Sequence, residues 1–393
     1  MTLKALESRF HVSARSVAPP ESGIVAVMNH GRQKDGLIPL WVGEGDLPTP
    51  AFICEAASRG LAAGETFYTW QRGVPELRQA LADYHTALFH QPFSPERFFV
   101  TGSGMQSIHI ALTITVETGD EVIVPTPEWP NFSAAVQVAG ARPVEVPLSF
   151  TDGRWEIDLD RIEAAITPRS KVLFINTPAN PSGWTASHDD IKAILALARK
   201  HGLWLIVDEV YTRFYYGPGN RAPSFHDVAE PTDRIIYVNT FSKNWAMTGW
   251  RVGWIEASPE LGDLIENMIQ YSTSGVAAFM QRAATVALKQ GEGFVAHQIA
   301  RARRGRELTM ETLSASNRVR FAVPDGAFYA FFAVDGEPDA RALAYRLVDE
   351  AGIGLAPGEA FGAGGSGYLR LCFARGEQSL AVALGRLGDW LRR

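Results

Sequence analysis

The segment TFSKNWAMTGWRVG at 240–253 surrounds a lysine with groups that suit a phosphorylated carbonyl compound. Thr240 supplies a hydroxyl donor, and Arg251, eight positions after Lys243, is a fixed cation that can form forked hydrogen bonds to a phosphate. An isolated lysine is most often a solvated surface charge. A lysine that is held near a phosphate site and partly desolvated is what a Schiff base with a phosphorylated aldehyde requires.

An aspartate follows the apolar run at 203–207 and opens the segment DEVY. Asp208 at this position is compatible with a metal ligand, a helix N-cap or a partner for a buried cation. No HxxxH or HExxH spacing occurs in the sequence, so we expect no metal. Aspartate is a favoured N-cap, and capping alone would be the default. Beside Lys243, pairing with a protonated pyridine nitrogen becomes the better interpretation.

Two further segments follow strand-like runs. NTPANPSG at 176–183 contains X-Pro steps and a glycine that predict an irregular turn, which would bring the Asn180 amide to the sheet edge of Asp208 and Lys243. TGSGMQS at 101–107 precedes an apolar helical run, and small residues at a helix N-terminus expose backbone amides to an anion. The residues expected to hold a phosphate there are Ser103, Gly104 and Met105.

These residues need elements that bring them together. Short apolar runs rich in Val and Ile predict buried strands at 98–101, 121–125, 171–175, 203–207 and 234–238. Segments of helical period lie between them, for example Ile191, Ile194, Leu195 and Ala198. The alternation predicts an α/β fold with a mostly parallel sheet and helices on both faces, whose ligands bind at the carboxyl ends of the strands.

The last third of the chain has a different pattern. An apolar run at 327–334 is followed by apolar stripes at 340–347 and 380–391, and this combination predicts a smaller α+β unit. The run GAGGSG at 362–367 has the letters of a GxGxxG dinucleotide loop. Because it lies late in the chain and precedes a strand-like segment, we interpret it as a flexible loop instead.

Composition limits the function classes. The chain has 393 residues, of which 46% are hydrophobic and 20% charged, as in globular proteins with a sizeable core. A net charge of −6 gives no basic surface for nucleic acid or anionic membranes. Cys54 and Cys372 can build neither a disulfide framework nor a zinc CxxC pair. The first fifteen residues lack the apolar core of a signal peptide, and we expect a soluble, cytoplasmic protein.

The order NPSG, DEVY, SKNWAMTGWRVG and a late Arg370 in YLRLCF resembles that of the class I/II aminotransferases of the pyridoxal-phosphate fold type I superfamily, which are aspartate aminotransferase-like. The resemblance extends from VGEGDLPTP at 42–50 to the final helix. It implies a large domain at 49–285, with a mostly parallel seven-stranded sheet sandwiched by helices. It also implies a small α+β domain from 1–48 plus 286–393 that closes over the active site.

The resemblance further implies the cofactor and the role of each residue around it. Pyridoxal 5′-phosphate would form a Schiff base with Lys243, which then carries the substrate proton, while Asp208 pairs with the pyridine nitrogen. Asn180 and Tyr211 would hydrogen-bond the phenolic oxygen, and Trp129 would stack on the ring. The phosphate would be bound by Ser103, Gly104, Met105, Thr240, Ser242 and Arg251.

The implied reaction is ping-pong transfer of an α-amino group from an amino acid to a 2-keto acid. Arg370 would bind the substrate α-carboxylate, with Asn180 and the Gly43 backbone nearby. The family's YxxxxGxxELR pattern implies a homodimer in which a tyrosine reaches the partner's phosphate. Here that pattern consists of Tyr68, Gly73, Glu76, Leu77 and Arg78.

Two other functions use the same scaffold. A C–S β-lyase would employ the same Lys, Asp and Arg but expel a leaving group from Cβ, and sequence separates it poorly from a transaminase. A cofactor-binding transcription regulator would need an N-terminal helix-turn-helix module, for which only about forty residues are present before VGEGD. Transamination is therefore the preferred function.

The sequence also points to a substrate class. An acidic side chain needs a second cation, and in aspartate-specific relatives a lysine often lies at the position of Met105, which is uncharged here. The segment SGIVAVM at 22–28, which usually lines the side-chain pocket, is apolar. An apolar wall would leave a second carboxylate unpaired, which is costly. We therefore expect a neutral donor such as alanine, methionine, or an aromatic or branched amino acid.

Overall fold

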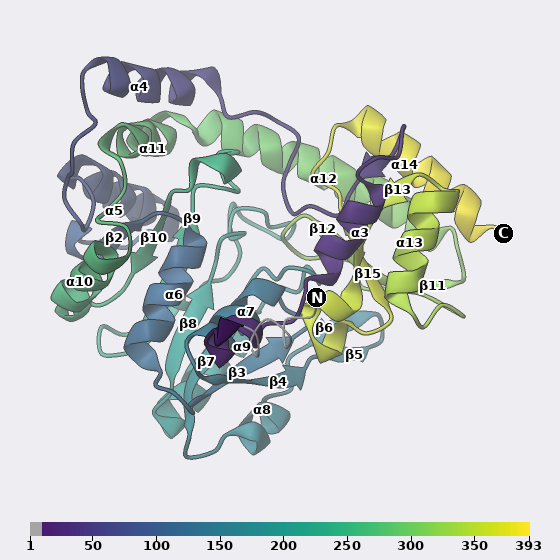
Figure 1. Cartoon of the computed structure of the whole chain (residues 1–393), viewed down its shortest axis with the longest axis horizontal. Helices are drawn as coiled ribbons and strands as arrows, with labels where there is room; N and C mark the ends of the chain where they lie inside the picture. Colours follow the sequence, from purple (N-terminus) through teal and green to yellow (C-terminus); the bar gives the residue numbers. More distant parts are fainter. Residues whose placement is uncertain (1–9) are drawn as a thin grey trace.

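A computed structural model describes residues 10–393, so the first nine residues of the predicted small domain lie outside the described residues. Within that range the largest sheet has seven strands in the order β2-β10-β9-β8-β7-β3-β4 (Figure 1). These strands are β2 (Phe98–Thr101), β3 (Glu121–Thr126), β4 (Arg142–Pro147), β7 (Ser170–Asn176), β8 (Trp204–Asp208), β9 (Ile235–Thr240) and β10 (Gly253–Glu256). All neighbours are parallel except β10, which is antiparallel to β2 and β9. The predicted α/β class and mostly parallel sheet are confirmed.

Helices cover both faces of this sheet. Leu205 and Val207 of β8 pack into the core on one face and Ile206 into the core on the other, as the alternation of side chains along a strand requires. The first core is covered by α8 (Leu159–Ala165) and α9 (His188–His201), the second by α6 (Gly104–Thr115), α7 (Pro130–Val138) and α10 (Gly262–Ser272). The helix α9 begins at a capping box of Ser187 and Asp190, which satisfies its first free N–H groups.

A third core lies at the β2 edge of the sheet. It is built by α4 (Ala51–Ala62), α5 (Pro75–Phe89) and α11 (Ala278–Gln290), which pack around the aromatic residues Phe98, Trp245 and Trp254. Figure 1 shows these three helices grouped on the side of the molecule opposite the chain's C-terminus.

A second, smaller sheet is formed from the C-terminal part of the chain. It has the order β11 (Val319–Phe321), β12 (Tyr329–Val334), β15 (Tyr368–Cys372) and β14 (Ala356–Pro357). The helices around it are α12 (Glu292–Ser314), α13 (Ala340–Glu350) and α14 (Glu377–Leu391). From the N-terminal part, α3 (Gly23–Gly31) lies beside α13, and β1 (Ile38–Pro39) pairs in parallel with β13 (Ile353–Gly354). The two ends of the chain thus meet, whereas the exact boundaries at 49 and 285 stay a prediction.

Among residues 10–393 the remaining elements are short. They are α2 (Ala14–Val17), the hairpin β5 (Ser149–Thr151) with β6 (Arg154–Glu156), and the 3₁₀ helices Pro95–Arg97, Phe225–Asp227, Thr248–Trp250, Pro259–Leu261, Gly358–Phe361 and Ala363–Gly365. Among residues 10–393, no helix is both long and apolar enough to cross a membrane.

The GAGGSG segment differs from the expected flexible loop because it packs against the large sheet. The Ala363 N–H donates to Glu145 Oε2 at 2.7 Å, and the Gly364 N–H donates to the hydroxyl of Thr126 at 3.2 Å. A Cβ on Gly364 would overlap the backbone of Thr126. The glycines therefore allow a close approach between the C-terminal part of the chain and the end of β3.

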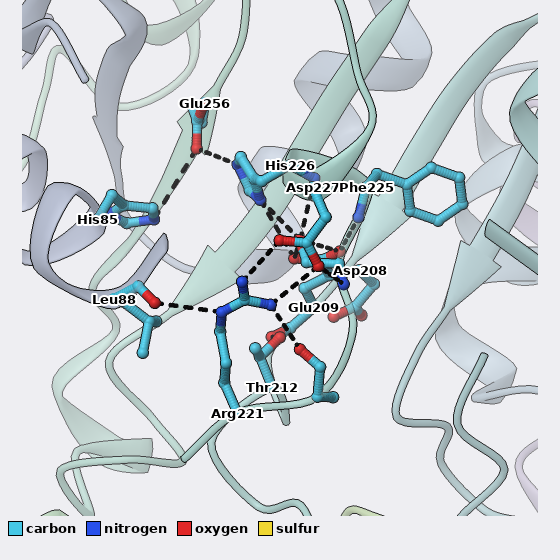
Figure 2. Close-up of polar contacts among 12 residues, drawn as sticks. His85, Leu88, Asp208, Glu209, Thr212, Arg221, Phe225, His226, Asp227 and Glu256 are labelled. Atoms are coloured by element: carbon cyan, nitrogen blue, oxygen red, sulfur yellow. Dashed lines mark hydrogen bonds and ion pairs between the residues drawn. The ribbon is translucent and has the colours of Figure 1, made fainter. Parts of the chain in front are cut away.

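A buried cluster of charged residues connects the end of β8 with the end of β10 (Figure 2). The His226 ring lies between Glu256, at 2.8 Å, and the hydroxyl of Ser224, at 2.8 Å, which itself donates to Glu209. Burial alone would lower the pKa of His226, but the two carboxylates outweigh it and raise the pKa to about 9. His226 is therefore an imidazolium that bridges Glu209 and Glu256 at neutral pH.

We expect the substitution His226→Gln to lower the free energy of unfolding by about 3–5 kcal/mol, because it leaves two buried carboxylates without their shared cation. The folded-state pKa lies above the ordinary value of 6.5, so this stabilisation is complete below pH 6.5 and is lost as the pH rises through about 9. Urea unfolding at fixed protein concentration and several pH values measures both effects.

The matched control is His201→Gln, because His201 also contacts a glutamate, Glu163 at 2.7 Å, but in a partly exposed pair. This substitution should cost about 0–1 kcal/mol. Equal losses in the two variants, or a His226→Gln loss that does not shrink between pH 6.5 and pH 9.5, would contradict the assignment of His226 as a buried imidazolium.

Candidate active site

A cavity of about 410 Å³ opens where the carboxyl ends of β7, β8 and β9 face the small sheet. Parallel strands place the residues after their last positions at one edge, and the register here sets Asn176 opposite Asp208 and Asp208 opposite Val238. Most of the predicted site residues line this cavity. They are Gly43, Gly104, Met105, Trp129, Asn180, Asp208, Tyr211, Thr240, Ser242, Lys243, Arg251 and Arg370.

Lys243 holds its amine inside this cavity. Its Nζ donates to the carbonyl of Gly43 at 2.7 Å and lies 5.7 Å from the centre of the Tyr211 ring. Burial lowers the pKa of the amine to about 8, while the nearby Asp208 carboxylate opposes the shift. A part of the population is therefore an uncharged amine near neutral pH, which is the form that can act as a nucleophile or a base.

Asp208 ends β8 and is buried at the bottom of the cavity. Burial raises the pKa of its carboxyl to about 7, although the Val210 N–H, which donates to Oδ1 at 3.1 Å, favours the charged form. No helix begins directly after β8, so the alternative role of Asp208 as a helix N-cap does not apply, and its carboxyl accepts only from this turn. A cation bound against the carboxyl would draw Asp208 into its charged form.

A second acid lies near Asp208. Glu128 is buried, and burial together with the charge of Asp208 raises the pKa of its carboxyl well above the usual range. The backbone N–H of Trp129 donates to Glu128 Oε1 at 2.6 Å. Burial thus favours the neutral form of Glu128, a residue that the sequence analysis did not select.

Asn176 connects the two strands that carry the predicted site residues. Its amide donates to the backbone carbonyl of Asp208 at 3.0 Å, and its side-chain oxygen accepts from the Asn180 N–H at 2.7 Å. The sequence analysis did not identify this role, although Asn176 is the first residue of the NTPANPSG segment. The residue fixes both Asp208 and Asn180 relative to the sheet.

Arg370 enters the cavity from β15 of the small sheet and is only 3% exposed. Its Nη1 donates to Asn180 Oδ1 at 2.9 Å and its Nη2 donates to the carbonyl of Trp41. The guanidinium lies 4.7 Å from the centre of the Tyr329 ring and 4.9 Å from that of Phe361. Its Nε is buried and has no acceptor among the described residues, so one donor of a firmly held cation is open.

The helix α6 begins beside the cavity with the N-cap Ser103. The Ser103 hydroxyl accepts from the Gln106 N–H at 3.1 Å, so it caps the helix and lies behind the cavity lining. The first N–H groups, on Gly104 and Met105, have no intrahelical acceptor, as at every helix N-terminus. The hydroxyls of Thr240 and Ser242, 2.9 Å apart, and the exposed Arg251 line the same part of the cavity. Together they form a concentration of donors and positive charge suited to a phosphate.

A glycine makes this arrangement possible. Any Cβ on Gly253, in β10, would lie 2.8 Å from backbone atoms of Ser103 and Gly104. Only glycine therefore allows β10 to pass directly behind the N-terminus of α6. The final glycine of the WRVG motif thus has a packing role.

Tyr68 lies outside the cavity and is 91% exposed, so a single chain does not bring it to the other predicted residues. Phe67 and Trp70, on either side of it, are also exposed, at 83% and 65%. Exposed aromatic side chains in this number are characteristic of surfaces that bind another protein.

Sequence analysis also missed the residues that reach the cavity from the N-terminal part and from β12. Ile24 and Met28 of α3 line it, as does Tyr329 of β12, whose hydroxyl lies 2.7 Å from that of Tyr211. The sequence feature that could have identified Tyr329 is its hydroxyl, because the rest of its strand is apolar. The apolar segment containing Ile24 and Met28 was correctly assigned to the cavity wall, but not residue by residue.

The sequence matches the family model for aminotransferase class I and II over residues 35–387. Its relatives include an aspartate aminotransferase of Thermotoga maritima, which is 33% identical over 92% of this chain and 93% of that protein. Another is the aromatic-amino-acid aminotransferase 2 of Thermococcus litoralis, which is 33% identical over 91% of this chain and 92% of that protein.

Solved structures agree with the sequence matches. The crystal structure of the aspartate aminotransferase from Thermotoga maritima superposes with a TM-score of 0.91 at 32% sequence identity. The superposition covers 97% of this chain and 100% of that structure's chain. The match in sequence and fold is nearly end to end, and the chain belongs to the class I and II aminotransferase family.

Proposed function

We propose that this aminotransferase binds pyridoxal 5′-phosphate in the 410 Å³ cavity, attached covalently to Lys243, and accepts neutral amino acids as donors. The proposal depends on one observation above the others: the Lys243 amine, the Asp208 carboxyl and the Arg370 guanidinium all line that single cavity. When bound, pyridoxal phosphate withdraws electrons from the α-carbon of an attached amino acid. The protein's residues must bind, orient and move protons around it.

The donor set fits the cofactor. Asp208 supplies a buried carboxyl whose pKa is about 7. Beside a pyridinium this pKa would fall, and the resulting carboxylate would keep the ring nitrogen protonated. Asn180 and Tyr211 supply an amide and a phenol for the phenolic oxygen, and Trp129 supplies an aromatic face for the ring. The start of α6, with Gly104 and Met105 behind the N-cap Ser103, and the side chains of Thr240, Ser242 and Arg251 would form the phosphate site.

Lys243 is suited to move the α-proton of the substrate. Its pKa of about 8 makes the amine a base that is matched to neutral pH. The Gly43 carbonyl accepts from the amine at 2.7 Å and keeps it directed into the cavity. A general base positioned in this way contributes about 10²–10⁴-fold to the rate.

Arg370 is suited to bind the substrate α-carboxylate. Its Nη atoms are already hydrogen-bonded to Asn180 and Trp41, and its buried Nε is open. A carboxylate would satisfy that donor and neutralise the guanidinium. This demands an α-amino acid rather than a simple amine.

The cavity supports a neutral substrate side chain. Its wall includes Ile24, Met28 and Ile108, and the cations among its described lining residues are Lys243, Arg251 and Arg370, all with roles above. A second carboxylate would remain unpaired, at a cost of several kcal/mol. The names of the two relatives, one for aspartate and one for aromatic amino acids, do not decide between the classes.

We also propose a homodimer in which Tyr68 reaches the partner's phosphate site. The 91% exposure of Tyr68 and the exposed aromatic residues Phe67 and Trp70 support this. A cytoplasmic location stays a prediction from the cysteine content. The C–S β-lyase is not favoured, because the matching family and the named relatives are aminotransferases.

We expect borohydride treatment of the yellow holoenzyme to attach the cofactor to the peptide that contains Lys243. The substitution Lys243→Ala should abolish this labelling and lower kcat by about 10²-fold or more, because the nucleophile and base are lost. Peptide mass spectrometry and single-turnover absorbance measure the two effects. Lys192→Ala is the control, because Lys192 is an exposed lysine of α9, and labelling of any other lysine would contradict the assignment.

We expect kcat/KM for alanine, methionine or phenylalanine to exceed that for aspartate, because each apolar methylene in contact with the wall contributes about 1–3 kcal/mol and the second carboxylate finds no cation. The substitution Met28→Arg should raise kcat/KM for aspartate selectively. Half-reaction rates with a panel of amino acids test both statements. If aspartate is the best donor of the wild type, a cation from outside the described cavity must enter it, and the neutral-donor proposal is wrong.

We expect Tyr68→Phe to weaken cofactor retention by about tenfold or more, because a hydrogen bond to a charged phosphate is lost. The dissociation constant of the cofactor measures this, and sedimentation reports the assembly in parallel. Tyr271→Phe serves as the matched control, since Tyr271 is likewise an exposed tyrosine, at 76%. A monomer that is fully active at nanomolar concentration would exclude the shared site.

A further inference from the structure

The Tyr329 side chain contacts three separate parts of the proposed cofactor and substrate site, namely Tyr211, Arg370 and Gly43. It lies in β12 of the small sheet and is fully buried, at 0% exposure. Its hydroxyl is 2.7 Å from that of Tyr211, and its ring lies beneath the Arg370 guanidinium at 4.7 Å. The hydroxyl also lies against Gly43, where any Cβ would overlap it. The same Gly43 carbonyl accepts from Lys243.

The proton arrangement of the two phenols is determined by their surroundings. Burial raises the pKa of both Tyr211 and Tyr329, so each carries its proton at neutral pH. A phenol has one O–H to donate. If Tyr211 donates to the phenolic oxygen of the cofactor, the hydrogen bond between the tyrosines must run from Tyr329 to Tyr211. The result is a directed chain from Tyr329 through Tyr211 to the cofactor.

We infer that Tyr329 is a positioning residue that strengthens the hydrogen bond from Tyr211 to the phenolic oxygen of pyridoxal phosphate. The inference rests on the proposed function. Hydrogen bonds in a chain polarise one another by about 10–30% per bond, so a donor behind Tyr211 makes Tyr211 the better donor. A better donor stabilises the phenolate and lowers the pH at which the cofactor, bound to Lys243, changes its protonation and its colour.

The hydrogen bond also joins two parts of the fold. Tyr211 follows β8 of the seven-stranded sheet, whereas Tyr329 lies in β12, which pairs with β15 so that Phe331 is opposite Arg370. Tyr329 thus presents its ring to the guanidinium of Arg370, which is proposed to bind the carboxylate. It presents its hydroxyl to the phenol of Tyr211, which is proposed to bind the cofactor. Tyr329 therefore relates the position of the small sheet to the electronic state of the cofactor.

The variant Tyr329→Phe tests the inference because it keeps the ring under Arg370 and removes only the hydroxyl. Visible absorbance of the holoenzyme, titrated with pH, should show its transition shifted upward by about 0.3–0.5 pH units. The other ionisable groups that face the two phenols, namely Lys243, Asp208, Arg370 and Cys372, are unchanged in the variant. Glu44, which faces Lys243, is unchanged as well. KM should change little, because the guanidinium keeps its aromatic support.

Three further variants separate positioning from general damage. Tyr211→Phe should shift the transition upward more than Tyr329→Phe does, and Tyr329→Phe should add nothing in the Tyr211→Phe background, since it acts through that phenol. Tyr216→Phe removes a partly buried phenol, which donates to the Ala327 carbonyl at 2.6 Å, and should leave the transition unchanged. Thermal unfolding of each apoprotein reports any loss of structure.

The outcomes are distinct. A Tyr329→Phe titration identical to the wild type, an equal shift in Tyr216→Phe, or an additive shift in the double variant would overturn the inference while leaving the proposed function intact. A wild type that binds no pyridoxal phosphate would overturn the proposed function itself. If Tyr329→Phe fails to fold, fluorotyrosine at position 329 provides the test. Its more acidic hydroxyl is a stronger donor and should shift the transition downward, and no shift or an upward shift would refute the inference.

Discussion

Burial of the Lys243 amine and the Asp208 carboxyl in one cavity is the constraint on which the rest of the site depends. Removing a charge from water is unfavourable, and here it lowers the pKa of the amine to about 8 and raises that of the carboxyl to about 7. Both groups are thereby poised near neutral pH, where small changes in their surroundings alter their charge. The walls that create this environment come from two sheets, so chemistry at Lys243 requires the two sheets to meet.

The meeting of the sheets follows from local features of the chain. β10 can pass behind the start of α6 only because position 253 is glycine. The glycine-rich segment at 362–367 similarly brings the C-terminal part of the chain against the end of β3, through the Ala363 N–H and Glu145. In both places a side chain as small as methyl would separate backbones that must touch. Glycine at these positions therefore allows the close backbone contacts around the site.

Sequence patterns predicted the parts of the fold that are encoded locally. Runs of β-branched residues identified β2, β3, β7, β8 and β9, and their alternation with helices indicated a parallel sheet whose carboxyl edge carries Asp208 and Lys243. The patterns did not identify β4, whose sequence RPVEVP contains two prolines and is half exposed, or the short β10. The two prolines of β4 are unfavourable in a strand interior, and β10 (GWIE) combines a glycine and a glutamate with only two apolar residues, so neither strand has a strong pattern of its own.

The residues that sequence missed share one property, which is that their role depends on distant parts of the chain. Asn176 acts through the backbone of Asp208, 32 positions away, and Tyr329 acts through Tyr211, 118 positions away. Their types, an amide after a strand and a phenol in an apolar strand, are compatible with plain packing. Only the register of two sheets turns them into parts of a site. A family motif is encoded within a short segment, whereas such support is encoded in the topology.

Arg370 shows how this support prepares the site for substrate. Two of its donors are already used on Asn180 and the Trp41 carbonyl, and two aromatic rings hold the guanidinium plane, so its orientation is fixed before a carboxylate arrives. Little side-chain entropy then remains to be lost on binding, which favours both affinity and alignment. Because Asn180 also faces the proposed cofactor, a carboxylate bound at Nε would be held at a fixed distance from the proposed reacting centre. Under the proposed function, the same contacts that bury the arginine would therefore determine where the α-carbon of the substrate lies.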